Sequence, residues 1–136
     1  MSIQLVRDIA GVRERLLAER REGGSVALVP TMGFLHEGHA TLIRRAAELA
    51  PVVVVSLFVN PLQFGPGEDL ERYPRNLDGD LKIAEDAGAH LVFAPYTADF
   101  VPADISVAVN PGRLGDVLCG RSRPGLAADA RARGLR

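Results

Sequence analysis

Two histidines and two glycines gather in the short segment Thr31–His39, between an apolar run and a helical pattern. The spacing of His36 and His39, three residues apart, places both on one face of the first turn of a helix. Gly33 and Gly38 lack a Cβ and can let a ligand approach the backbone closely. The N-terminus of a helix attracts phosphate through its unpaired N–H groups and its dipole, and the dipole disfavours imidazolium. The pattern favours neutral histidines that donate an N–H toward a nucleotide phosphate.

Two other interpretations of the histidine pair stay open on spacing alone. The histidines can be incidental surface residues, or they can form a His-x-x-His metal pair that awaits a carboxylate or a cysteine. Cys119 is the only cysteine of the sequence, and no Cys/His cluster stands near the pair. We therefore predict no metal site. Cys119 is interpreted as a small structural hydrophobe, and His90, at the start of a strand, as structural.

Apolar periodicity around this segment predicts alternating strands and helices. The predicted strands are Ile3–Val6, Val26–Val29 (ending at Pro30), Val52–Val59 and Leu91–Ala94. The predicted helices are one capped by Asp8 with the stripe Ile9, Val12, Leu16 and Leu17, one over Ala40–Ala50, and one capped by Asn76 with Leu77, Leu81, Ala84 and Ala87. This alternation predicts an α/β fold with a doubly wound parallel sheet, Rossmann-like, in which Val52–Val59 is buried on both faces.

The order of these elements puts the histidine segment at the carboxyl edge of the sheet, where open α/β sheets bind ligands. Asn60 and Gln63 follow the strand Val52–Val59, so we expect them at the same edge. Beyond Pro95 the pattern is weaker and predicts only a strand over Ile105–Val109 and a short helix over Arg113–Leu118.

Composition and charge limit the classes of molecule that the protein is expected to bind. The 136 residues fit one domain, and 16 basic against 17 acidic side chains give a net charge of −1, which argues against nucleic acid and anionic membranes. Met1–Asp8 lacks the features of a secretory signal, and no apolar run approaches a membrane span. We expect a cytoplasmic protein that binds small molecules or other protein chains.

Three motifs in order then resemble the pantothenate synthetase (pantoate–β-alanine ligase) family, adenylyltransferase-type enzymes related to the HIGH-motif nucleotidyltransferases. They are Pro30–His39 (PTMGFLHEGH), Ser56–Phe64 (SLFVNPLQF) and Glu68–Arg75 (EDLERYPR). The resemblance implies an enzyme that joins pantoate to β-alanine with ATP and magnesium through a pantoyl-adenylate, and that forms a homodimer.

The resemblance also implies roles for particular residues. The ATP site would comprise Met32, Gly33, Phe34, Leu35, His36, Glu37, Gly38 and His39. His39, assisted by His36, would be the catalytic proton donor. Gln63, Asn60, Met32 and Tyr73 would bind pantoate and β-alanine. A neutral amide such as that of Gln63 suits this role, since it both donates and accepts hydrogen bonds.

The chain departs from the family pattern after Gly125. Family members are roughly twice as long, a difference that amounts to another domain. Residues 1–125 correspond to the N-terminal part of the nucleotide-binding domain, and 126–136 form a divergent Ala/Arg-rich tail. The later motifs, whose lysine and arginine grip the triphosphate, and the C-terminal domain are absent. We therefore expect little or no ligase activity from these 136 residues alone. The alternative is a noncatalytic half-domain that binds nucleotide or self-associates.

Overall fold

The computed structural model describes residues 2–64, 74–101, 112–117 and 121. The chain divides into two compact units. The first comprises residues 1–59 and 74–100, and the second comprises residues 60–73 and 101–136. The first unit contains the histidine segment and all the strands that the structure describes.

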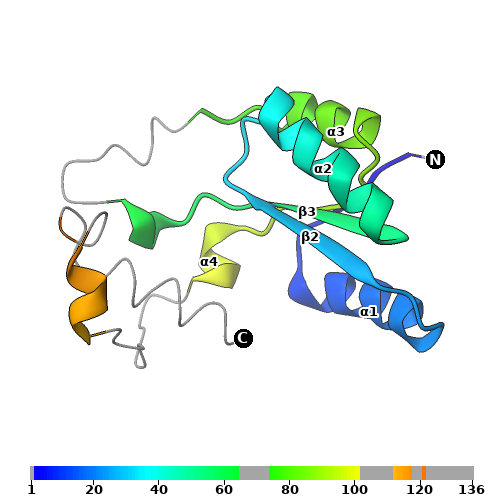
Figure 1. The fold of residues 1–136 in the computed structure, drawn as a ribbon, viewed down its shortest axis with the longest axis horizontal. Coiled ribbons are helices and arrows are strands. Elements are labelled where there is room, and N and C mark those ends of the chain that lie inside the picture. Colours follow the sequence, from blue (N-terminus) through cyan, green and yellow to red (C-terminus); the bar gives the residue numbers. More distant parts are fainter. Residues whose placement is uncertain (1, 65–73, 102–111, 118–120, 122–136) are drawn as a thin grey trace. The chain divides into compact units, whose positions relative to one another are not determined.

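The first unit is a parallel sheet with helices on both faces. Its strands are β1 (Gln4–Val6), β2 (Val26–Thr31), β3 (Val52–Leu57) and β4 (Leu91–Phe93), in the order β1-β4-β3-β2. All neighbouring strands run parallel. Helices α2 (Glu37–Leu49) and α3 (Leu77–Asp86) cover one face, and α1 (Ile9–Arg21) covers the other (Figure 1). The predicted doubly wound α/β sheet is confirmed.

Strand β3 is buried on both faces. Val52, Val53, Val54 and Val55 are each at most 5% exposed, as predicted for a strand covered on both faces.

Strand β2 is longer than predicted, because it continues through Pro30 to Thr31, two residues beyond the predicted end. Proline cannot donate a ladder hydrogen bond, but β2 is at the edge of the described sheet, where proline is tolerated.

Two apolar clusters flank the sheet. The first lies under α2 and α3 and includes Ile43, Ala84, Val53, Val55 and Val92. The second lies under α1 and includes Val6, Val52, Val54 and Leu91, with Val12 and Leu16 packed against it.

The predicted apolar stripe of α1 is only half right. Ile9 and Leu17 are 41% and 52% exposed, whereas Val12 and Leu16 pack on the sheet. Leu17 is rotated by about 100° from Leu16 around the helix axis, so the two cannot both face a flat sheet.

The predicted caps are confirmed. The side chain of Asp8 accepts a hydrogen bond from the Gly11 N–H at 2.7 Å, and Asn76 accepts one from Gly79 at 3.2 Å. Gly88, just beyond the end of α3, has a φ of +97°, a left-handed conformation that suits glycine. Helix α2 begins three residues before the predicted Ala40, so His39 lies within the helix.

Other differences are small. Strand β3 ends at Leu57 and β4 at Phe93, short of the predicted Val59 and Ala94, and helix α4 (Thr97–Phe100) was not predicted. The second unit contains η1 (Pro61–Gln63) and η3 (Gly112–Asp116), a 3-10 helix that overlaps the predicted helix Arg113–Leu118. The predicted strand Ile105–Val109, Cys119 and the tail 126–136 lie outside the described residues. Among the described helices, none has the length and apolar character to cross a membrane.

Candidate functional site

The segment Thr31–His39, called the histidine turn below, leaves the carboxyl end of β2 and enters α2. Thr31 pairs with Leu57 at the end of β3, so the turn starts at the carboxyl edge of the sheet. The Thr31 hydroxyl donates to the Ser56 carbonyl at 2.9 Å and accepts from the Gly33 N–H at 3.1 Å. Thr31 thereby ties the start of the turn to β3, a role that sequence patterns did not reveal.

The middle of the turn is left-handed at two consecutive residues. Gly33 has a φ of +87° and Phe34 a φ of +54°, the only positive φ at a non-glycine residue in the described part of the chain. A left-handed phenylalanine costs on the order of 1 kcal/mol, because its Cβ crowds the backbone. The Phe34 side chain is 54% exposed, so no burial of its ring offsets that cost. Other interactions must hold the turn.

Asp80 supplies those interactions from the first turn of α3. Its carboxylate accepts a hydrogen bond from the Phe34 N–H at 2.9 Å through Oδ2 and one from the Leu35 N–H at 2.6 Å through Oδ1. The residue is only 4% exposed. Hydrogen bonds to an ionised carboxylate are roughly twice as strong as neutral ones. Asp80 thus fixes the strained part of the turn. It was not among the predicted site residues.

The two histidines cap α2 reciprocally. His36 is the N-cap, and its Nδ1 accepts from the Gly38 N–H at 3.1 Å. The Nδ1 of His39 accepts from the His36 N–H at 3.3 Å, and the ring centroids are 4.1 Å apart. A neutral imidazole whose Nδ1 accepts carries its proton on Nε2. Both rings therefore keep an Nε2–H for a ligand, and the predicted shared face is confirmed.

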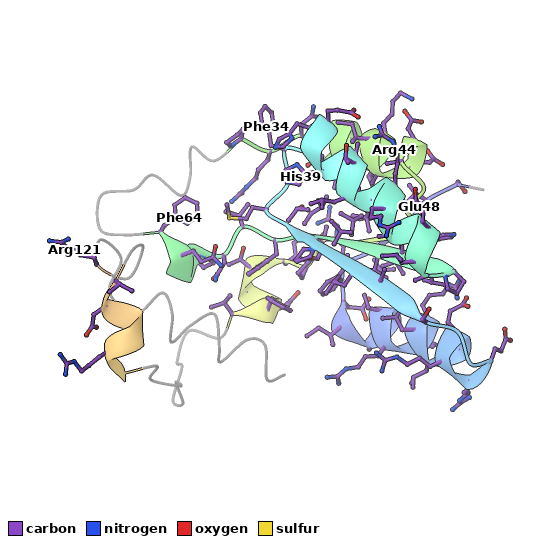
Figure 2. All side chains as sticks on the ribbon, in the orientation of Figure 1. Phe34, His39, Arg44, Glu48, Phe64 and Arg121 are labelled. Carbon is purple, nitrogen blue, oxygen red and sulfur yellow. The ribbon has the colours of Figure 1, made fainter. Side chains whose placement is uncertain are left out.

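The protonation state of His39 follows from its surroundings. Partial burial lowers the pKa of His39 below its ordinary value, His36 lowers it further, and the Asp80 carboxylate opposes both. The ring is consequently neutral at neutral pH, in agreement with the expectation for an imidazole at the start of a helix. Figure 2 shows Phe34 and His39 at the same end of α2, with Arg44 further along the helix. The Glu37 carboxylate pairs with Arg44 at 2.8 Å at the surface.

The backbone of the turn differs from the expectation of unpaired N–H groups ready for phosphate. The Thr31 hydroxyl accepts a hydrogen bond from the Gly33 N–H. The Asp80 carboxylate accepts from Phe34 and Leu35. The two imidazoles accept from the N–H groups of His36 and Gly38. The protein's own acceptors thus occupy most of the main-chain donors. The imidazole Nε2–H groups remain as side-chain donors of the turn.

A cavity of about 280 Å³ adjoins the turn at Met32 and Gly33, and neither His36 nor His39 lines it. It is lined by Met32 and Gly33, by the carboxyl ends of β3 and β4, and by the start of α3 including Asp80. Arg7 also lines it and is held by a hydrogen bond to the Ala94 carbonyl at 3.2 Å and by the ring of Tyr96, 4.8 Å away. Met32 therefore lines a hollow large enough for a small organic molecule.

The remaining predicted site residues lie elsewhere in the chain. Asn60 and Gln63 belong to the second unit, where Asn60 is 3% exposed and its carbonyl accepts from the Gln63 N–H at 3.1 Å. Their proximity to the histidines stays a prediction. Tyr73 lies outside the described residues. His90 is structural, as predicted, because its Nδ1 accepts from the Val53 N–H at 3.1 Å. Within the described residues, no three His, Cys, Asp or Glu side chains cluster in a way that could hold a metal.

The fold and the site together define a class: a Rossmann-like α/β domain with a histidine turn at the ligand-binding edge of its sheet. Comparison with known proteins identifies the family. The family model described as pantoate-beta-alanine ligase matches residues 4–128, and the chain belongs to this family.

Individual relatives agree with this assignment. A pantothenate synthetase of Desulfitobacterium hafniense is 51% identical over 121 residues, which cover 89% of this chain and 43% of the relative. One of Moorella thermoacetica is 50% identical over 123 residues, covering 90% and 44%. The crystal structure of pantothenate synthetase from Thermus thermophilus superposes with a TM-score of 0.83 at 43% identity, covering 96% of this chain and 47% of that one.

A further solved structure carries ligands. Pantoate-beta-alanine ligase from Francisella tularensis, complexed with beta-gamma ATP and beta-alanine, superposes with a TM-score of 0.79 at 30% identity. The match covers 93% of this chain and 48% of that one. The present chain therefore spans less than half the length of the relatives that it matches.

Proposed function

We propose that this chain forms the adenylating part of a pantoate–β-alanine ligase, which binds ATP and pantoate for the first chemical step. The observation that carries the proposal is the pair of neutral imidazoles that cap α2 and keep both Nε2–H groups as donors. Family membership supports it, as does the complex of the Francisella relative with beta-gamma ATP and beta-alanine.

In the proposed step, a carboxylate oxygen of pantoate attacks the α-phosphorus of ATP. The new P–O bond forms as the bond to the β-phosphate oxygen breaks, giving pantoyl-adenylate and pyrophosphate. Negative charge increases on the nonbridging oxygens and on the departing pyrophosphate, so positioned donors lower the barrier. His39 and His36 would supply these donors, and the neutral His39 would stabilise the departing pyrophosphate through a hydrogen bond from its Nε2–H without transferring the proton. Magnesium enters with ATP, and the phosphate oxygens supply much of its coordination.

The second proposed step forms the amide. The amine of β-alanine attacks the activated carbonyl carbon, a C–N bond forms, the C–O bond to AMP breaks with its electron pair leaving on AMP, and the nitrogen releases one proton to solvent. Gln63, with Asn60, Met32 and Tyr73, would hold pantoate beside the α-phosphate so that attack becomes nearly intramolecular. The family resemblance is the basis for two of these roles: the binding of pantoate by Gln63, and the lining of the substrate cavity by Tyr73.

Titration calorimetry of the 136-residue chain with MgATP tests the nucleotide site. We expect binding that weakens about tenfold or more in His39→Ala, since a hydrogen bond to a charged group is lost. Arg45→Gln is the matched control, because Arg45 is an exposed residue of the same helix and pairs with Glu48 at the surface. Equal binding by wild type and His39→Ala would overturn the role of His39. No heat with MgATP would overturn nucleotide binding.

Coupled assays test the chemistry separately. We expect pantoate-dependent release of pyrophosphate from ATP by the chain alone to be at least about a thousandfold slower than from a full-length relative, equivalent to about 4 kcal/mol of lost transition-state stabilisation. AMP release that requires both pantoate and β-alanine, at the rate of a full-length relative, would contradict the expectation of weak activity. The same proposal places the protein in the cytoplasm, where ATP is available.

A second candidate function is self-association, favoured by exposed apolar side chains. Leu28 on β2 and Leu42 and Leu49 on α2 are 57% to 65% exposed. Exposed apolar groups on an edge strand and its neighbouring helix favour association with another copy. We expect a homodimer in sedimentation experiments at micromolar concentration, and a monomer at all concentrations would exclude this candidate.

A further inference from the structure

Asp80 is the buried carboxylate of the first unit that the proposed reaction does not use directly. It lies on α3, 46 residues after Phe34 in the sequence, and both of its carboxylate oxygens are bonded to the histidine turn. The residue is 4% exposed, in a helix whose other first-turn acid, Asp78, is exposed. A buried charge is costly unless it is fully hydrogen-bonded, so its position calls for a specific function.

The geometry explains what Asp80 does for the turn. Gly33 and Phe34 adopt consecutive left-handed conformations, and the two N–H groups that donate to the Asp80 carboxylate belong to Phe34 and the next residue, Leu35. These bonds immediately precede His36, whose extended conformation makes it the N-cap of α2. A Cβ at Gly33 would lie 3.2 Å from Asp80 Oδ2, so the carboxylate is packed closely against the turn.

The capping pair depends on this arrangement. His36 can accept from Gly38, and His39 can accept from His36, only if the chain enters α2 at the observed angle. Those two bonds are also what confine the proton of each neutral ring to Nε2. If the turn relaxed at Phe34, His36 would lose its position and the rings could adopt either tautomer.

We infer that Asp80 is a positioning residue for the proposed adenylation site: through its two hydrogen bonds to the histidine turn it sets the tautomer and direction of His36 and His39. This rests on the proposed function for its catalytic meaning. Its structural content, the control of the histidine tautomers, is independent of any ligand. The effect reaches the ligand only through the turn, because Asp80 itself bonds the backbone of Phe34 and Leu35.

The decisive measurement is the ¹⁵N NMR spectrum of the histidine side chains in the full 136-residue chain without ligand. In the wild type, both His36 and His39 should give the pattern of the Nε2–H tautomer. In Asp80→Asn, one oxygen that accepts is replaced by an NH₂ group that cannot, and we expect both rings to show mixed tautomers. Asp78→Asn is the control, since it removes a charge from the same helical turn without touching the histidine turn.

Two further variants guard against a simple folding defect. Phe34→Gly relieves the left-handed strain, so in the double variant Asp80→Asn/Phe34→Gly we expect part of the Nε2–H pattern to return. Asp80→Glu keeps the charge but moves the carboxylate, and should resemble Asp80→Asn rather than wild type. If Asp80→Asn fails to fold, Asp80→Glu carries the test. Unchanged tautomers in every folded Asp80 variant would overturn the inference.

A parallel titration with MgATP separates this inference from the proposed function. If the wild-type chain binds MgATP, Asp80→Asn should weaken binding about tenfold and Asp78→Asn less than twofold, as expected when donors to phosphate are misplaced. Tautomer changes without any MgATP binding in the wild type would retain the positioning role and reject the nucleotide site. Wild-type binding that is identical in Asp80→Asn would reject the positioning role and retain the nucleotide site.

Discussion

Helices α2 and α3 begin next to one another but are capped by different chemistry. Asn76, one of the best N-cap residues, caps α3 locally through the Gly79 N–H. His36 and His39 cap α2, and the turn before them depends on Asp80 from the other helix. Histidine is not among the favoured caps. The histidine caps therefore stabilise the start of α2 less than a good local cap would. The buried Asp80 carboxylate of α3 adds stability through its two hydrogen bonds to the turn.

Removing the Asp80 carboxylate should destabilise the start of α2 and leave the start of α3 intact. In Asp80→Ala, the N–H groups of Phe34 and Leu35 lose their acceptors while α3 keeps Asn76 as its cap. We expect a loss of about 2–4 kcal/mol in the free energy of unfolding, because one buried and one partly buried donor are left unsatisfied. Urea unfolding measures it. In the control Asp78→Ala we expect less than about 1 kcal/mol, and equal losses in the two variants would show that Asp80 acts only as a helix-terminal charge.

The contrast between the two helix starts also marks what could be predicted from the sequence. Asp8 and Asn76 were recognised as caps because capping is local and these residue types favour it. The strands β2, β3 and β4 were located because apolar runs report burial. Thr31 and Asp80 were missed for the opposite reason: the Thr31 hydroxyl bonds Ser56, and the Asp80 carboxylate bonds residues that lie 45 and 46 positions before it.

The left-handed Phe34 could not be predicted either. Sequence patterns suggest positive φ at glycine or asparagine, not at phenylalanine. Its conformation is set by bonds from another helix, and no local signal reports them. The histidines were identified by type and spacing, but their reciprocal capping required the geometry of the turn. The placement of Gln63 beside them still stands on the family resemblance.

Substitution of alanine for glycine compares the stability of the histidine turn, at Gly33, with that of an ordinary helix end, at Gly23 after α1. Gly33 and Gly23 both have positive φ, +87° and +77°, so alanine is strained at either. A Cβ at Gly23 meets nothing within 4 Å, whereas one at Gly33 meets Asp80 Oδ2 at 3.2 Å. We expect Gly23→Ala to cost roughly 1 kcal/mol and Gly33→Ala roughly 1 kcal/mol more. Thermal unfolding measures the loss of stability in each variant. Equal losses would mean that the Asp80 side chain can move away from the added methyl group at no cost.

The caps themselves give a smaller effect. Asn76→Ala should cost about 1 kcal/mol, the usual value for losing a good N-cap. His36→Ala should cost about half of that, because an imidazole is a poorer cap and Asp80 still holds the turn. Chemical denaturation of both variants decides the matter. A larger loss in His36→Ala than in Asn76→Ala would reverse the ranking of the two helix starts.

The smallest expected effect is a dependence on pH that belongs to α2 and not to α3. Burial first, and then His36, lowers the pKa of His39 below its ordinary value of 6.5, although Asp80 partly opposes the shift. As the pH falls through 6.5, the unfolded chain takes up a proton at His39 before the folded chain does. The stability gained from the neutral ring is therefore complete above that pH and declines as the pH drops toward the lowered pKa.

The same protonation acts on the cap itself. A proton on Nδ1 of His39 removes the acceptor that the His36 N–H uses, so the first turn of α2 should fray in acid while α3, capped by a neutral amide, should not. Amide hydrogen exchange between about pH 8 and about pH 5, corrected for the intrinsic rates, measures both helices in one sample. In His39→Gln the additional opening of α2 at low pH should disappear. Opening of α2 and α3 in parallel, in wild type and variant alike, would instead indicate a general loss of stability unrelated to the histidine cap.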